Sequence, residues 1–212
     1  MLDDVIATAN KAKPDFIFVG GSQLQNSVDE TVVHIKSLTT IPVVLFPGNA
    51  FQLTNKADAL LLLSLISGRN AEWLIGQHVQ AAKAIQESAL ETISTGYILI
   101  DGGNTTAVER VSKTKPLQRD AIEEVVSTAL AGELLGNKLI YLEAGSGAQN
   151  PVPTSLIKAV KESIHIPLIV GGGLTSTDAI KKAYEAGADI VVVGNYLETH
   201  LEKMVDFCAV RN

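Results

Sequence analysis

Short apolar runs rich in β-branched residues recur along the whole chain. Within each run the apolar residues are continuous rather than alternating with polar ones, which is typical of parallel strands buried on both faces. We therefore predict a parallel sheet of seven strands. The runs are FIFVGG (16–21), VVLFPG (43–48), ALLLLSLI (59–66), GYILIDGG (96–103), LIYLEAG (139–145), PLIVGGG (167–173) and DIVVVGN (189–195).

Between these runs lie segments whose apolar residues recur with a helical period, for example 27–38, 120–135, 153–164 and 176–187. Pro153 precedes one of them, and Ser176 opens another with a side chain suited to an N-cap. Strand and helix alternate without a low-complexity linker, so we expect one α/β domain over residues 1–212. The two candidate architectures are an open doubly wound sheet and a closed (β/α)8 TIM barrel.

Glycine or polar residues follow almost every predicted strand at its carboxyl end. In a barrel these ends form a single ring that holds the active site, whereas an open sheet concentrates such residues near one switch point. The pattern therefore favours the barrel. The residues are Gly20–Ser22, Pro47–Asn49, Asp101–Gly103, Glu143–Gly145, Gly171–Gly173 and Gly194–Asn195.

The amino-terminal segment does not fit a complete barrel. A (β/α)8 barrel begins with a strand, but residues 1–15 have the pattern of a helix. We therefore expect the first strand to be missing from this chain. We also expect residues 49–57 to form a short or degenerate third helix.

The last two strand ends indicate phosphate binding. Gly172 and Gly173 precede the predicted helix at Ser176, and Gly194 with Asn195 opens the final helix. In many barrels these two loops hold a phosphate through backbone amides, which a side chain at a glycine position would block. The alternative is that the glycines only make tight turns.

Composition limits the class of protein. Hydrophobic residues make up 46% of the chain, enough for a large core, and no apolar run is long enough to span a bilayer. The single Cys208 excludes a disulfide framework, and the start lacks the pattern of a signal peptide, so we expect a cytoplasmic protein. The net charge of −6 argues against general nucleic-acid binding.

Several stretches taken together resemble the geranylgeranylglyceryl phosphate synthase family, which includes the bacterial heptaprenylglyceryl phosphate synthases. The resemblance covers about residues 14–200. It implies a (β/α)8 barrel that joins the primary hydroxyl of sn-glycerol 1-phosphate to an allylic prenyl diphosphate, with Mg²⁺ as cofactor and pyrophosphate as leaving group. The stretches are FIFVGGS, VVLFPGNA, SGRNAEWLIG, YLEAGSGAQNPVP and IVGGGLTSTDAIKKAYEAGADIVVVGN.

The resemblance also implies site residues. Glu143 would take the proton of the glycerol hydroxyl, Ser22 would lie near the magnesium, and the protein would be a homo-oligomer. The family carries an Asp-Pro-Asp-Lys type motif at its first strand, and this sequence has none. The chain is therefore either a truncated form or a relative with a compromised metal site. The implied glycerol phosphate site is Tyr141, Leu142, Glu143, Ala144, Gly145, Ser146, Gly147, Gly172, Gly173, Gly194 and Asn195.

Other interpretations stay open from the residues alone. Glu143 could be a buried carboxylate paired with a Lys or Arg, and Asp101 could reach the site or only cap its turn. The segment 67–85, with Trp73 and the small Ala81, could line a prenyl groove or simply pack on the barrel. We expect geranylgeranyl diphosphate as donor. The alternatives are a heptaprenyl donor, another barrel enzyme acting on a sugar phosphate, and a non-catalytic phosphate-binding barrel without its metal site.

Overall fold

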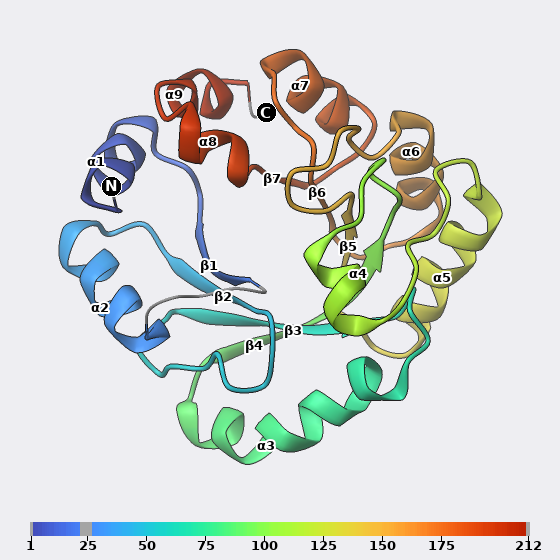
Figure 1. The fold of residues 1–212 in the computed structure, drawn as a ribbon, viewed down its shortest axis with the longest axis horizontal. Coiled ribbons are helices and arrows are strands. Elements are labelled where there is room, and N and C mark those ends of the chain that lie inside the picture. Colours follow the sequence, from blue (N-terminus) through green and yellow to red (C-terminus); the bar gives the residue numbers. More distant parts are fainter. Residues whose placement is uncertain (1, 22–26, 211–212) are drawn as a thin grey trace.

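A computed structural model describes residues 2–21 and 27–210, in which the seven predicted strands form one parallel sheet. The strands lie side by side in chain order and curl into a barrel, with the helices around the outside (Figure 1). The predicted TIM-barrel fold is thus confirmed. The strands are β1 (Ile17–Gly21), β2 (Val43–Pro47), β3 (Ala59–Leu65), β4 (Glu91–Leu99), β5 (Leu139–Glu143), β6 (Leu168–Gly171) and β7 (Ile190–Val192).

Helices over the outer surface connect most strands to the next, as parallel pairing requires, whereas β2 and β3 are joined by a loop without a helix. The predicted helix start at Ser176 is confirmed, because its side chain accepts a hydrogen bond from the amide of Ala179 and caps the helix. The helices are α1 (Leu2–Ala12), α2 (Val28–Leu38), the π-helical turn η1 (Glu72–Gly76), α3 (Gln77–Ser88), α4 (Ala107–Ser112), α5 (Ile122–Leu134), α6 (Thr154–Ser163), α7 (Thr177–Glu185), α8 (Asn195–Thr199) and α9 (Lys203–Cys208).

Three local expectations differ from the structure. Residues 49–57 form turns and irregular backbone, so the expected third helix is wrong. Strand β4 begins at Glu91, earlier than expected, because its polar first half pairs with β3 from Ala59 onward. The final helix is divided into α8 and α9 by a turn at 200–202.

Alternation along each strand divides the core into two parts. Tyr97, Leu99 and Tyr141 belong to the apolar cluster inside the barrel. Their strand neighbours Ile98 and Leu142 instead belong to a second cluster, in which the sheet packs against α5 and α6. Because successive side chains on a strand point to opposite faces, every second residue of β4 and β5 is available to the barrel interior.

The two outer strands of the sheet, β1 and β7, are not paired with each other within residues 2–21 and 27–210. A cleft of about 410 Å³ lies between them, lined mainly by apolar side chains of α1, β1, β7, α8 and α9. Helix α1 packs against α9 on the outer side of this region, where Figure 1 places them side by side. Each of the seven described strands corresponds to one of the seven predicted apolar runs.

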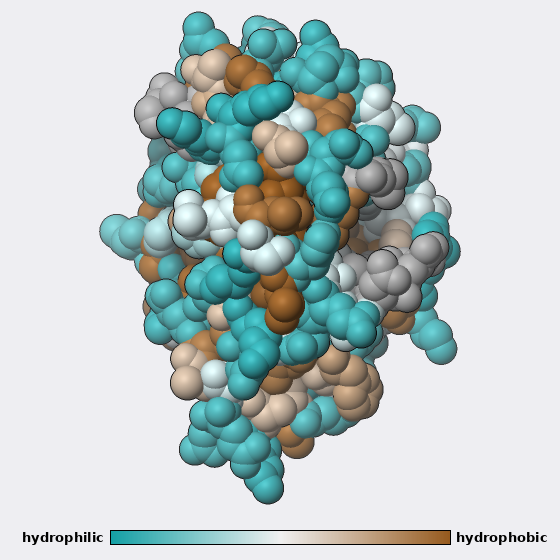
Figure 2. Space-filling view, turned by 90° about the vertical axis from the view of Figure 1, so that its left-hand side faces the viewer, coloured by the Kyte–Doolittle hydropathy of each residue, from teal (hydrophilic) through white to brown (hydrophobic). Residues whose placement is uncertain are grey.

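Hydrophobic side chains also reach the outer surface. Figure 2 views the face that carries α1 and α2, where hydrophobic patches lie between hydrophilic ones. Leu2, Val33 and Leu38 are the exposed large apolar residues of these two helices. None of the described helices is both long enough and apolar enough to cross a membrane.

Candidate active site

The carboxyl ends of β5, β6 and β7 lie next to one another at one end of the barrel. In the strand register Glu143 is the partner of Gly171, and Gly171 is the partner of Val192. The sequence places glycine or polar residues after each of these positions, and parallel pairing brings them to the same mouth. The structure thus brings together the ends of three strands on which the predicted residues lie.

Glu143 is a buried carboxylate at this mouth, with 8% of its surface exposed. Its Oε1 accepts a hydrogen bond of 2.7 Å from the amide of Gly145, and the hydroxyl of Tyr141 donates a second hydrogen bond to the carboxylate. No Lys or Arg among the described residues forms an ion pair with it, so the alternative of a structural ion pair is wrong for this part of the chain.

Burial raises the pKa of the Glu143 carboxyl above its usual value, although the hydrogen bonds from Tyr141 and Gly145 oppose the rise. The pKa is raised overall, so this carboxylate is a stronger base than a carboxylate in water. Carboxyl groups with a perturbed pKa are often found at acid–base sites. The geometry therefore fits a group that accepts a proton.

Gly171, the last residue of β6, and Gly172 pack directly on this carboxylate, whereas Gly173 packs on the loop after β5. A Cβ at Gly171 would lie 2.5 Å from the Tyr141 hydroxyl and 2.9 Å from Glu143 Oε2. A Cβ at Gly172 would lie 2.4 Å from Glu143 Oε1, and one at Gly173 would lie 2.8 Å from the amide nitrogen of Pro151. These positions therefore exclude side chains because of contacts within the chain itself. Phosphate binding by Gly172 and Gly173 stays a prediction.

The loop after β5 carries the remaining predicted residues. The Ser146 hydroxyl donates a hydrogen bond to Oδ1 of Asn195, which joins this loop to the start of α8. Gly147 has a φ of +70°, and nothing lies within 4 Å of the Cβ position at either Gly147 or Gly194. The backbone amides in this region are thus accessible to a ligand, because no side chain of their own covers them.

The loop after β4 supports the loop after β5, a role that the sequence analysis did not anticipate. The carbonyl of Gly102 accepts hydrogen bonds of 3.0 Å from the amides of both Gln149 and Asn150. Asn104 Nδ2 donates to the carbonyl of Gly147 at 3.2 Å. Asp101 accepts the amide of Gly103 at 2.9 Å, which is the turn-capping role considered for it.

Two of the predicted residues do not present side chains to the mouth. Leu142 and Ala144 are fully buried and belong to the outer cluster between the sheet and its helices, so they can contribute only backbone groups. Ser22, the predicted metal residue, lies outside the described residues. No three His, Cys, Asp or Glu side chains gather into a metal-binding group in the described part of the chain.

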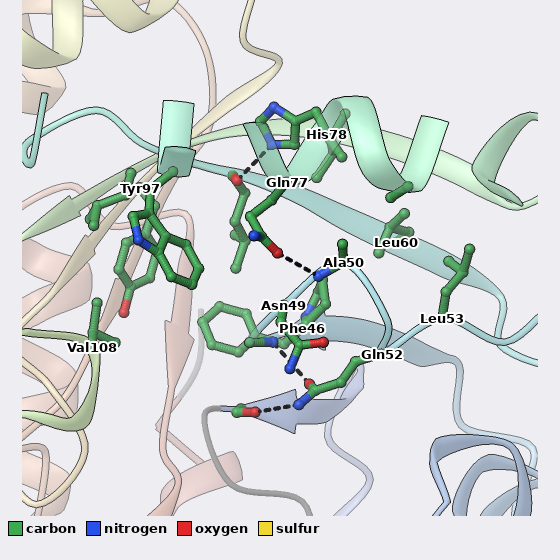
Figure 3. A pocket seen from close by; sticks show the side chains of 18 of the residues that line it. Phe46, Asn49, Ala50, Gln52, Leu53, Leu60, Gln77, His78, Tyr97 and Val108 are labelled. Atoms are coloured by element: carbon green, nitrogen blue, oxygen red, sulfur yellow. Dashed lines mark hydrogen bonds between the residues drawn. The ribbon is translucent and has the colours of Figure 1, made fainter. Parts of the chain in front are cut away.

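An apolar pocket opens beside this mouth, between the loop after β2 and the η1–α3 segment (Figure 3). Trp73 and Ala81, which were candidates for a groove, are among its lining residues, together with Tyr97, which was not. The sequence could not single out Tyr97, because it lies within an ordinary apolar strand. Other residues of the wall are Leu53, Leu60, Leu62, Leu63, Leu65, Ile85 and Val108.

Two glutamine side chains fix the loop that borders this pocket. Gln77 accepts a hydrogen bond of 2.9 Å from the amide of Ala50. Gln52 accepts from the amide of Gly48 at 2.9 Å and donates to the carbonyl of Gly21 at 2.8 Å. Figure 3 shows these hydrogen bonds, together with the one between His78 and the carbonyl of Leu63. The wall is therefore mainly apolar, and Gln52, Gln77 and His78 bond to backbone groups around it.

Comparison with known proteins gives a consistent picture. The sequence model of the PcrB family matches residues 1–211. The chain is 56% identical over 183 residues to a geranylgeranylglyceryl phosphate synthase of Zunongwangia profunda, covering 86% of this chain and 78% of that protein. It is 51% identical over 198 residues to the protein of the same name from Flavobacterium johnsoniae, covering 93% of this chain and 82% of that protein.

A solved structure agrees with these sequence matches. The crystal structure of (S)-3-O-geranylgeranylglyceryl phosphate synthase from Thermoplasma acidophilum, in complex with its substrate sn-glycerol 1-phosphate, superposes with a TM-score of 0.93. The sequence identity is 34%, and the alignment covers 99% of this chain and 86% of that one.

Proposed function

Because the chain belongs to the PcrB family, we propose that it is a prenyltransferase that joins sn-glycerol 1-phosphate to a prenyl diphosphate. The products are an ether lipid precursor and pyrophosphate. The observation that carries the proposal is the buried carboxylate of Glu143, which has no cationic partner among the described residues and lies at the same barrel mouth as an apolar pocket. The hydroxyl that accepts the prenyl group needs a base, and the prenyl chain needs an apolar pocket beside it.

The acceptor half of the site comprises the loops after β5, β6 and β7. Backbone amides around Ser146–Gly147, Gly172–Gly173 and Gly194 offer donors for a phosphate, and the Thermoplasma protein of the same fold binds sn-glycerol 1-phosphate. The Ser146–Asn195 hydrogen bond holds two of these loops together. The glycerol hydroxyls then lie toward Glu143 and Tyr141.

Glu143 acts as the base in this proposal. The bond between the allylic carbon and the diphosphate oxygen breaks, and pyrophosphate leaves with the electron pair. The primary hydroxyl oxygen of the glycerol forms the new bond to that carbon, and its proton passes to the Glu143 carboxylate. A base of modest strength is enough, because the hydroxyl becomes acidic as it attacks a carbon that carries positive charge.

The donor half is the apolar pocket, whose walls would hold the prenyl chain. An alkyl or isoprenoid chain gains about 25 cal/mol for each Å² that it buries against such walls. We propose geranylgeranyl diphosphate as the donor, in keeping with the names of the relatives. A heptaprenyl donor is the alternative, and the length of the pocket beyond Ala81 decides between them.

A panel of donors tests this function. Purified protein, Mg²⁺ and labelled sn-glycerol 1-phosphate are incubated with diphosphates of 10 to about 35 carbons, which spans the known range of such isoprenoid chains. We expect ether product with the highest kcat/KM for the geranylgeranyl donor. No lipid product with any donor would contradict the proposal and leave a non-catalytic phosphate-binding barrel. Turnover of a sugar phosphate without prenyl donor would instead indicate a different barrel enzyme.

We also propose that the enzyme depends on Mg²⁺, because a diphosphate leaving group carries concentrated negative charge. When bound, a hard divalent cation neutralises diphosphate oxygens and is held by them together with one or two protein ligands. The described residues supply no ligand cluster, so the proposal assigns no step of the mechanism to the ion and places Ser22 near it only as an expectation.

Metal removal has a clear expected outcome. Excess EDTA should lower turnover by about 10³-fold or more, because charge stabilisation of a phosphate leaving group by a metal contributes several kcal/mol. Added Mg²⁺ should restore the rate, whereas added Ca²⁺ should restore less of it. Unchanged turnover in EDTA would remove Mg²⁺ from the mechanism.

Assembly and location complete the proposal. We propose a homo-oligomer that acts in the cytoplasm. Exposed leucines support association, since Leu134 and Leu135 are more than four-fifths exposed and the patches on α1 and α2 are also apolar (Figure 2). Light scattering coupled to size-exclusion chromatography measures the molar mass, and a value of 22.5 kDa would contradict the oligomer.

A further inference from the structure

Four aromatic rings lie inside the barrel, contributed by β1, β2, β4 and β5. Tyr97 meets Tyr141 edge to face, with ring centroids 5.4 Å apart and an interplanar angle of 63°. Phe46 contacts both of these rings, at 6.0 Å from Tyr97 and 5.6 Å from Tyr141, and it stacks on Phe18 at 6.3 Å. The rings thus form one connected group at the centre of the barrel.

Tyr97 occupies the junction between the two halves of the site. It lines the apolar pocket, where Figure 3 shows its ring at one end. On its other side it contacts Tyr141, whose hydroxyl is bonded to Glu143. Tyr97 is also the register partner of Tyr141 on the neighbouring strand. Phe46 also lines the pocket and contacts Tyr141, so a chain that fills the pocket and reaches toward Glu143 passes beside both rings.

The reaction places positive charge at this junction. In the proposed transfer, the allylic carbon is bonded to the end of the prenyl chain and is attacked by a hydroxyl beside Glu143. The charge develops after the carbon–oxygen bond to pyrophosphate has begun to break. An aromatic face within about 6 Å attracts a cation through its quadrupole, and more strongly where water is excluded. Tyr97 is buried, with 5% of its surface exposed.

We propose that Tyr97 is a further catalytic residue, whose ring stabilises the allylic cation and shields it from water during prenyl transfer. The inference rests on the proposed function, because it needs a prenyl diphosphate as donor. The ring does not exchange a proton or form a bond. Its effect is electrostatic, and it acts on the charged transition state rather than on the bound substrate, so it should change kcat more than KM.

The Tyr97 hydroxyl is not the proposed catalytic group. Burial first, and the nearby Glu143 carboxylate second, raise the pKa of Tyr97 well above 10.0, so the phenol stays neutral and is a weak proton donor. The ring and the hydroxyl can be separated by substitution. Tyr97→Phe keeps the ring, whereas Tyr97→Leu removes it and leaves a side chain that is still apolar.

The decisive experiment varies the ring electrostatics without changing its shape. Tyr97 is replaced by Phe and then by mono-, di- and trifluorophenylalanine through unnatural amino-acid incorporation, and kcat and KM are measured with geranylgeranyl diphosphate and sn-glycerol 1-phosphate. We expect Tyr97→Phe to retain kcat within about threefold. Each fluorine should then lower kcat by about twofold to threefold with little change in KM, since cation–π attraction falls as the ring face becomes less negative.

A second measurement follows the fate of the cation. Capture by water forms a carbon–oxygen bond to the water oxygen, releases its proton and gives the prenol in place of the ether. Tyr97→Leu should lower kcat by about 10-fold or more and raise the share of prenol among the products. Leu61→Ala is the control, since Leu61 is 2% exposed inside the barrel and does not line the pocket. It should destabilise the fold while keeping the wild-type ratio of ether to prenol.

The outcomes separate the two proposals. Ether product from the wild type, together with a kcat that does not change across the fluorinated series, would overturn the role of Tyr97 and leave the function intact. Loss of activity already in Tyr97→Phe would overturn it as well, because the hydroxyl would then be the essential group. A wild type that makes no ether with any donor would overturn the function, and this inference with it.

Discussion

Glu143→Gln should reduce turnover by about 10³-fold while the protein stays folded. General-base catalysis contributes about 10²–10⁴ to such reactions, and an amide cannot accept the proton of the attacking hydroxyl. The amide keeps an oxygen that can accept from the amide of Gly145, so the local geometry is preserved. Steady-state kinetics with sn-glycerol 1-phosphate and geranylgeranyl diphosphate measures the effect, and kcat should fall more than KM rises.

The same substitution should raise the thermal stability at neutral pH. The folded-state pKa of Glu143 lies above the usual 4.5, so the folded protein holds this proton more tightly than the unfolded chain does. Stability from this group is therefore present below pH 4.5 and is lost as the pH rises through the folded-state pKa. Glu143→Gln removes the ionisable group and with it this loss. The Tm of the variant should therefore exceed that of the wild type at a pH above the folded-state pKa, and should approach the wild-type value below pH 4.5.

The pH profile of the wild type supplies a further check. Catalysis needs the ionised carboxylate, so kcat should fall as the pH drops through the raised pKa of Glu143. Glu133→Gln is the matched control, because Glu133 lies on α5 and its side chain contacts His165, away from the barrel mouth. It removes one carboxylate and should keep wild-type turnover. Full activity in Glu143→Gln would exclude Glu143 as the base.

Gly172→Ala should be strongly damaging, although it adds a single methyl group. The φ of +82° is unfavourable for alanine by about 1–2 kcal/mol. The new methyl would also lie 2.4 Å from Glu143 Oε1, 2.6 Å from the amide nitrogen of Gly145 and 2.9 Å from that of Ala144. Backbone atoms cannot move aside cheaply, so overpacking adds about 1–3 kcal/mol. We expect a large fall in Tm, with activity lost because Glu143 is displaced.

Gly136→Ala separates the two contributions. Gly136 follows α5 and also has a positive φ, +92°, but nothing lies within 4 Å of the Cβ position. Gly136→Ala should therefore lower the free energy of unfolding only by the cost of a positive φ for alanine, and should leave kcat unchanged. Urea unfolding gives both free energies of unfolding. Equal losses for the two variants would show that the predicted contacts of Gly172 do not exist in solution.

Local sequence patterns were sufficient for most of the architecture. Continuous apolar runs predict buried parallel strands, and helical periods between them predict the crossovers, because both signals depend on residues close in the sequence. The same reasoning placed Glu143 and the glycines after β6 at one mouth, since parallel strands align their carboxyl ends. It was less successful at 49–57, where weak helical character gave way to the turns that border the pocket.

The sequence by itself determined the barrel, the order of its strands and the strand ends that carry the candidate chemistry, because each follows from local periodicity and the geometry of parallel pairing. Only the tertiary structure decided what those residues touch. It placed Leu142 in the outer core, packed Gly172 on the Glu143 carboxylate and set Tyr97 between the pocket and Tyr141. These relations join residues far apart in the chain, and no local pattern encodes the distance between them.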